Sequence, residues 1–137
     1  MKRLVVSVVT AVFSVTHAMA QSQFDGRWTL TLKCSKLPDT KAYKHIFNVN
    51  VKDGVLDGDY IVPGHDNGHF HLYGPIRSDG SAYLHMSGES GNPEYTFGHP
   101  NPGAPIDFDL DSKFTSSQGK GRRVQQRPCV ATFSKMP

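Results

Sequence analysis

Long apolar runs are missing from almost all of this sequence. The longest, residues 4–15, is interrupted by three hydroxyl side chains and is too short to cross a bilayer, which needs about 20 apolar residues. It follows two basic residues and leads to a small-residue site at residues 18–20, the order that is typical of a secretory signal peptide. We expect a signal peptide at residues 1–20 and a periplasmic or secreted domain at residues 21–137, with no membrane span after cleavage. An uncleaved anchor is the alternative.

A strong charge excess is also lacking. The formal net charge of +3 falls to +1 when the signal peptide removes Lys2 and Arg3. So small a charge gives no electrostatic reason to expect nucleic acid or a membrane surface as a partner. Aromatic residues do not alternate with the basic residues near the carboxyl end, as a single-strand nucleic-acid platform would require. We therefore expect no nucleic-acid partner.

Cysteine is scarce. The chain has two, Cys34 and Cys129, and an even pair in an exported chain most simply forms a disulfide. A bridge across about 95 residues would restrict the unfolded chain and stabilise the fold by a few kcal/mol. Two free thiols are the alternative.

Helical periodicity is absent from the mature chain, whereas apolar and polar residues alternate between clusters of Gly, Asp, Asn and Pro. Asp53-Gly54 is a two-residue hairpin signal, and pairing across it sets Val51 opposite Leu56. A turn at residues 78–80 keeps the same parity. The pattern predicts antiparallel strands near residues 26–34, 43–52, 55–62, 69–76, 82–86, 106–114 and 129–133.

The cysteines predict how the sheet closes. If Cys34 lies opposite Cys129 on antiparallel strands, Leu32 meets Ala131 on the apolar face, and the first and last strands are neighbours. An up-and-down meander closes in this way only with an even number of strands, so we expect residues 95–97 to supply the eighth. The predicted fold class is all-β, a single eight-stranded antiparallel up-and-down barrel of calycin-like form. A two-sheet β-sandwich is the alternative.

Three motifs resemble a family of small exported bacterial proteins without assigned function: Phe24-Asp25-Gly26-Arg27-Trp28, Gly119-Lys120-Gly121-Arg122-Arg123 and Arg127-Pro128-Cys129. The resemblance spans essentially the whole mature chain and implies no known activity. The Gly-x-Trp opening and the Asp-Gly-Val-Leu-Asp-Gly-Asp-Tyr segment at residues 53–60 are more distantly similar to avidin-like and lipocalin-like barrels, which implies a barrel fold. Biotin-binding residues are not transferred, because the polar ring of that pocket has no position-by-position match.

A recognisable catalytic set is lacking. The serines lie in turns without a Gly-x-Ser-x-Gly elbow, and no carboxylate pair stands apart from turn acids such as Asp53 and Asp79. The glycine-containing loop at residues 88–91 does not predict a phosphate cradle. We therefore expect neither an enzyme nor a cofactor.

Histidines are the most suggestive polar residues. His69 and His71 share the outward face of one expected strand, and the register places His85 diagonal to His71. Three imidazoles on one patch could bind Zn²⁺ or Cu²⁺. We expect no carboxylate in register with them, and solvated surface histidines are the alternative.

His45 differs from these histidines, because alternation places it among the inward residues near the barrel end that carries the 63–68 loop. With Tyr43, His65 and Asp66 it could line a ligand cup. A histidine that caps the core through one hydrogen bond is the alternative.

Basic residues concentrate between residues 120 and 127, which include Arg122 and Arg123. Arginine forks suit carboxylate or phosphate groups, so both arginines are candidate ligand-binding residues. A solvated edge, or pairing with the acidic residues of strand 106–114, is the alternative.

These features favour a non-enzymatic, monomeric barrel that binds an unknown small molecule or an envelope protein at its loop end, near His45 and the 87–104 loop. An inhibitor or envelope interaction module is one alternative, and a periplasmic metal-binding protein that uses the surface histidines is another. We expect a filled floor and a polar open rim, because about twenty bulky inward side chains fill most of an eight-stranded barrel.

Overall fold

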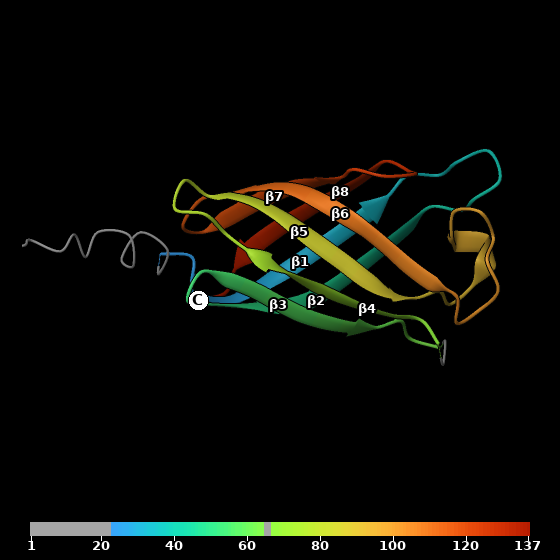
Figure 1. The fold of residues 1–137 in the computed structure, drawn as a ribbon, viewed down its shortest axis with the longest axis horizontal. Helices are drawn as coiled ribbons and strands as arrows, with labels where there is room; N and C mark the ends of the chain where they lie inside the picture. The colour runs from blue at the N-terminus through green and yellow to red at the C-terminus, as the bar shows by residue number, and fades with distance from the viewer. Residues whose placement is uncertain (1–22, 65–66) are drawn as a thin grey trace, which may run out of the picture.

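The computed structural model describes residues 23–64 and 67–137, which form one closed antiparallel barrel (Figure 1). The expected signal peptide, His65 and Asp66 lie outside the described residues. The strands follow one another around the barrel in chain order, which confirms the up-and-down topology and excludes the sandwich. They are β1 (Gly26–Cys34), β2 (Tyr43–Lys52), β3 (Val55–Ile61), β4 (His69–Pro75), β5 (Ser81–Glu89), β6 (Pro105–Phe114), β7 (Gln118–Arg123) and β8 (Cys129–Lys135).

The barrel closes between its first and last strands, as predicted. β1 pairs antiparallel with β8, with Cys34 opposite Cys129 and Leu32 opposite Ala131. The two cysteines form a disulfide. Because this bridge joins positions 95 residues apart, it restricts the unfolded chain strongly.

The eighth strand is not the one expected. Residues 95–97 form no strand: Pro93–Tyr95 is a 3-10 helix, η1, whose cap residue Asn92 accepts a hydrogen bond from the backbone N–H of Glu94. The strand that completes the barrel is β7, which pairs with β6 and β8. Its inward positions are two glycines and Arg123, so apolar alternation could not reveal it. In the part of the chain that the structure describes, no helix is long and apolar enough to cross a membrane.

Glycine is required at one of those inward positions because an aromatic ring covers it. A Cβ at Gly119 would lie 2.6 Å from Cδ1 of Phe114, closer than carbon atoms pack. The absence of a side chain at Gly119 therefore leaves room for the Phe114 ring in the core.

The two ends of the barrel differ. Longer connections gather at one end, here called the loop end, and tight turns lie with the carboxyl terminus at the other, the turn end (Figure 1). Among those tight turns, Asp53-Gly54 has positive φ at both residues, as its hairpin signal requires. Val51 pairs with Leu56 as predicted.

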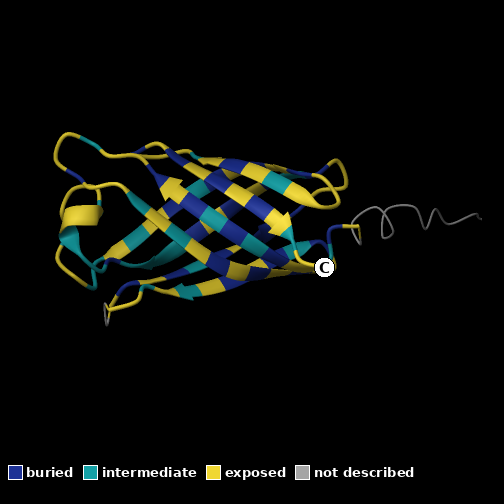
Figure 2. Cartoon of the chain, turned by 180° about the vertical axis from the view of Figure 1, so that it is seen from behind, coloured by how far each residue is buried: buried dark blue, intermediate teal, exposed yellow. Residues whose placement is uncertain are grey.

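Core side chains fill the turn end. Trp28 is fully buried, its indole Nε1 donates to the Phe24 carbonyl at 2.9 Å, and its ring meets Phe114 edge-on with centroids 5.5 Å apart. Burial alternates residue by residue along the strands (Figure 2). The predicted filled floor is therefore confirmed, and open space in the barrel is left to the loop end.

Candidate functional site: a cup at the loop end

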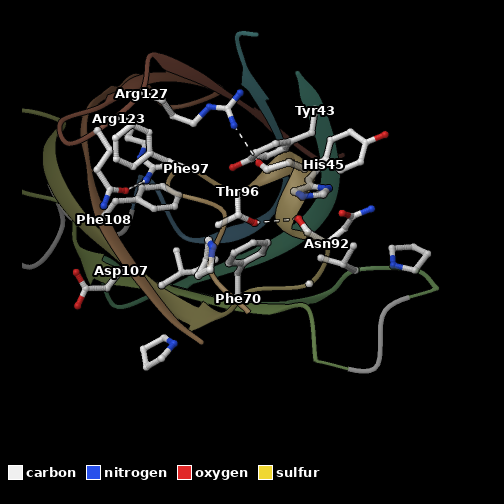
Figure 3. Close-up of a pocket in the computed structure, with 18 residues that line it drawn as sticks. Tyr43, His45, Phe70, Asn92, Thr96, Phe97, Asp107, Phe108, Arg123 and Arg127 are labelled. Atoms are coloured by element: carbon white, nitrogen blue, oxygen red, sulfur yellow. Dashed lines mark hydrogen bonds between the residues drawn. The ribbon is translucent and has the colours of Figure 1, made fainter. Parts of the chain in front are cut away.

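A cavity of about 400 Å³ opens at the loop end (Figure 3). Its wall combines inward residues near the ends of β2, β4, β6 and β7 with the connection between β5 and β6, mainly residues 91–97. We call this cavity the cup. Its volume lies within the range of roughly 300–1,000 Å³ that small-molecule sites occupy.

One wall of the cup is aromatic. The His45 ring lies 4.6 Å from the Tyr43 ring, 5.0 Å from the Tyr60 ring and 5.7 Å from the Phe70 ring, centroid to centroid. Burial among these rings lowers the pKa of His45 to about 4, so its imidazole is neutral at pH 7. Alternation along β2 thus placed Tyr43 and His45 correctly on the inner face.

Arg123 supplies a cation to the wall at the end of β7. Its guanidinium carbon lies 3.8 Å from the centroid of the Phe108 ring. Nε donates to the Gln125 carbonyl at 2.9 Å, and Nη2 donates to the Gln126 side-chain oxygen. Burial lowers the pKa of Arg123, yet an arginine stays charged at neutral pH. These contacts hold the guanidinium plane in one orientation.

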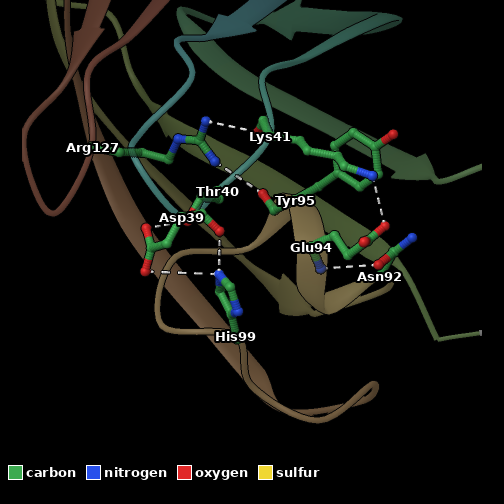
Figure 4. A network of polar contacts seen from close by, with 8 residues as sticks. All are labelled: Asp39, Thr40, Lys41, Asn92, Glu94, Tyr95, His99 and Arg127. Atoms are coloured by element: carbon green, nitrogen blue, oxygen red, sulfur yellow. Dashed lines mark hydrogen bonds and ion pairs between the residues drawn. The ribbon is translucent and has the colours of Figure 1, made fainter.

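Arg127 is a site residue that the sequence marked only as the end of the basic run and as part of the Arg127-Pro128-Cys129 motif. Its side chain is buried, with 3% of the residue exposed. Nη2 donates to the Ser35 carbonyl. Nη1 also donates to the Tyr95 carbonyl at 2.9 Å, and Nη2 to the Lys41 carbonyl at 3.1 Å (Figure 4). One guanidinium therefore ties together three segments of the loop end. One signal in the sequence could have indicated this role. Arg127 lies two residues before Cys129, and the disulfide of Cys129 fixes that segment at the loop end.

The rim of the cup is mixed rather than only polar. Lys41 Nζ bonds to the Glu94 carboxylate at 3.0 Å, and His99 Nε2 lies 2.6 Å from the Asp39 carbonyl (Figure 4). Beside these polar groups Phe97 is 45% exposed. The expectation of a polar rim was therefore wrong in part, because a phenyl ring also borders the opening.

The connection between β5 and β6 is anchored from within. Ser90 is fully buried, and its hydroxyl donates to the Asn101 carbonyl at 2.7 Å. Its backbone N–H donates to the Ala104 carbonyl at 2.9 Å, and its own carbonyl accepts from the Gly103 N–H at 2.8 Å. This part of the wall is thus held in place by hydrogen bonds.

Of the remaining predicted cup residues, Arg122 lies on the outer face of the barrel. Arg122 precedes Arg123 on β7, so its side chain takes the opposite face of the sheet and is exposed, opposite Asp111 in the register. It does not line the cup. His65 and Asp66 lie outside the described residues, although their neighbour Pro63 is part of the wall.

The histidine patch is on the outer face, and the expectation that no carboxylate lies in register with it was wrong. Asp59 is directly opposite His71 and Asp109 is directly opposite His85. Each carboxylate lies 2.8 Å from the Nδ1 atom of its histidine. His71 and His85 therefore each contact a carboxylate.

Strand geometry explains which ligand atoms converge there. Side chains directly opposite each other are about 5 Å apart, whereas diagonal ones are about 7–8 Å apart. Among the described residues, the group whose ligand atoms lie within 4.8 Å of one another is Asp57, Asp59 and His71. His69 and His85 are not part of it. The prediction of a three-histidine metal site remains a prediction.

Fold and site together define a class: a closed eight-stranded up-and-down barrel, filled at one end and cupped at the other. Comparison of the chain with protein-family models, with curated proteins and with solved structures finds no match. The cup's own residues are therefore the basis for assigning a function.

Proposed function

We propose that this protein binds a small organic molecule in the cup and performs no chemistry on it. The observation that carries the proposal is a cavity of about 400 Å³ at the loop end, with an aromatic wall and polar side chains beside it. Ligand sites are typically concave, mostly apolar and supplied with a small number of fixed polar groups. The volume is near the lower limit of such sites, so the ligand is small.

The fixed geometry of the wall supports binding. Arg127 joins the connection after β1 to η1 (Pro93–Tyr95) through hydrogen bonds to backbone carbonyls. Ser90 anchors the connection between β5 and β6, to which η1 belongs. A site that is ordered before the ligand arrives loses less conformational entropy on binding.

The surroundings of His45 support binding rather than proton transfer. A catalytic histidine is usually oriented by a carboxylate. Histidine–carboxylate contacts within 4.0 Å in the described part of the chain involve His71, His85 and His99, whereas the neighbours of His45 are aromatic rings. A neutral imidazole among rings offers a flat surface and one polar edge to a ligand.

A neutral fluorescent probe tests the proposal. N-phenyl-1-naphthylamine should bind the wild-type protein with one-to-one stoichiometry. Thr96→Trp, which puts a bulky ring into the cup wall, should weaken binding at least about tenfold, the effect of about 1.4 kcal/mol. Ser116→Trp, an exposed position at the turn end, is the matched control and should bind as the wild type does. Equal binding by both variants, or none by the wild type, contradicts the proposal.

Docking of an envelope protein at the rim is the competing function. Mass spectrometry of the native protein from its producing cells should reveal a bound small molecule, and pull-down from envelope extract should recover no stoichiometric protein. A stoichiometric protein that is lost in Phe97→Ala, at the exposed rim, would favour docking instead.

A further inference from the structure

The charged residues of the cup wall are unbalanced. Arg123, Arg127 and Asp107 all border the cavity, and Asp107 is exposed to solvent. Along β6, Phe108 points into the barrel and Asp107 therefore points out (Figure 3). In the described residues, the carboxylates that form ion pairs within 4.0 Å pair with Lys41 and with histidines, not with these arginines. Among the described residues, the inner wall thus has two cations and no acid within ion-pair distance of them.

Arg127 is the more deeply buried of the two. With 3% of the residue exposed, its charge is compensated by three backbone carbonyls and by the face of Tyr43, whose ring centroid lies 5.2 Å from its guanidinium carbon. Its Nε is buried and has no hydrogen-bond partner among the described residues. A buried charge without an ionic partner is costly, and an anion in the cup would relieve that cost.

Arg123 is oriented to receive that anion. A guanidinium has five N–H donors. Hydrogen bonds to Gln125 and Gln126 use two of those of Arg123, and the Tyr43 hydroxyl is a further polar neighbour. Its guanidinium carbon lies over the Phe108 ring, 3.8 Å from the ring centroid. The remaining N–H donors of a guanidinium held in this way suit a planar acceptor that has two oxygens, such as a carboxylate.

Aromatic rings surround the rest of the space. Tyr43, His45 and Phe70 form one wall of the cavity, and Phe97 belongs to the segment that borders the opening. Flat rings pack well in offset or edge-on contact with such a wall. The apolar part of the ligand is thus expected to be an aromatic ring system.

We propose that the ligand is a small aromatic carboxylate, with its carboxylate on Arg123 beside Arg127 and its ring against Tyr43, His45 and Phe70. This inference rests on the proposed function, since it specifies the chemistry of the molecule that the cup binds. It excludes neutral and cationic ligands as the preferred occupants.

A matched pair of probes tests it: 2-naphthoate and its neutral isostere 2-naphthamide, titrated calorimetrically at pH 7 into the full mature protein. The wild type should bind the acid at least about tenfold more tightly than the amide, the ratio that a charge-assisted hydrogen bond supports. Arg123→Gln should abolish this preference and change amide binding by less than about threefold. Arg122→Gln, the neighbouring arginine on the outer face, should keep the preference.

The outcomes separate the two proposals. If acid and amide bind equally to the wild type, or if Arg123→Gln keeps the preference, the anion inference is overturned while the cup remains a binding site. If neither probe binds and the neutral fluorescent probe also fails, the proposed function is contradicted as well. If the fluorescent probe binds in the cup and neither naphthalene does, only the ligand class inferred here is overturned.

Discussion

At the scale of single residues, His45 links the cup to pH. Burial lowers its pKa from 6.5 to about 4, so between these values the unfolded chain binds a proton that the folded chain does not. The contribution of neutral His45 to stability is therefore fully present above pH 6.5. It is lost as the pH falls toward 4, and below pH 4 there is no further loss.

We therefore expect the urea midpoint of the wild type to fall between pH 7 and pH 5, and to fall less in His45→Gln. His69→Gln, at an exposed position, is the control and should follow the wild type. The same slope in all three proteins would contradict a half-buried, neutral His45.

Arg127 gives a second prediction at this scale. Arg127→Met keeps much of the side-chain volume and removes three hydrogen bonds to backbone carbonyls. We expect a loss of about 2 kcal/mol in the free energy of unfolding, because carbonyls at the loop end lose their donors. Faster hydrogen exchange at residues 35–41 and 93–97 should accompany it. Arg122→Met should change neither, and equal stability of the two variants would contradict the role given to Arg127.

Sequence could place some of these residues and not others. Alternation along a strand fixes the face of Tyr43, His45 and Arg123 once one neighbour is known to be buried. Because the sequence did not reveal β7 as a strand, alternation could not be applied to it. Arg122 was therefore predicted as a ligand-binding residue along with Arg123. The role of Arg127 depends on carbonyls brought together only by folding.

At the scale of elements, β7 is the strand that its sequence conceals. Its inward glycines give no apolar signal, whereas Tyr95-Thr96-Phe97 has the β-branched and aromatic residues typical of strands. Pro93 and the cap residue Asn92 direct that segment into η1 instead, consistent with the preference of proline for the first helical turn.

A pair of valine substitutions tests this view of β7. Gly119→Val places a side chain where a Cβ already comes within 2.6 Å of the Phe114 ring, and overpacking of this kind costs about 1–3 kcal/mol. Lys120→Val, one residue along and exposed, should alter stability by about 0.5 kcal/mol or less. Urea unfolding of both variants measures the difference. Equal midpoints would mean that the inward face of β7 has spare room.

The pairing of β3 with β4 gives a prediction about metals. If the outer face of these strands binds Zn²⁺, excess Zn²⁺ should raise the melting temperature, because a ligand that binds only the folded state stabilises it. Asp57, Asp59 and His71 have converging ligand atoms, so His71→Ala should remove the rise. His69→Ala should remove it only if the three-histidine hypothesis is right. An unchanged melting temperature in the wild type contradicts both sets of ligands.

At the scale of the whole molecule, closure could be predicted because two independent patterns agreed. The cysteine pair and the apolar alternation required the same register between the first and last strands, and β1 and β8 have that register. For the cup, the sequence could predict only its location at the loop end. Its volume and its cations depend on how loops pack, and loop packing leaves no periodic signal in the sequence.

The central claim is that the cup at the loop end is the binding site of the barrel. Two-dimensional NMR of the protein titrated with 2-naphthoate tests it most directly. We expect shifts of the signals from Tyr43, His45, Arg123 and residues 93–97, and none from the turns at residues 53–54 and 78–80. Shifts concentrated at the turn end or spread over the outer face would contradict the claim.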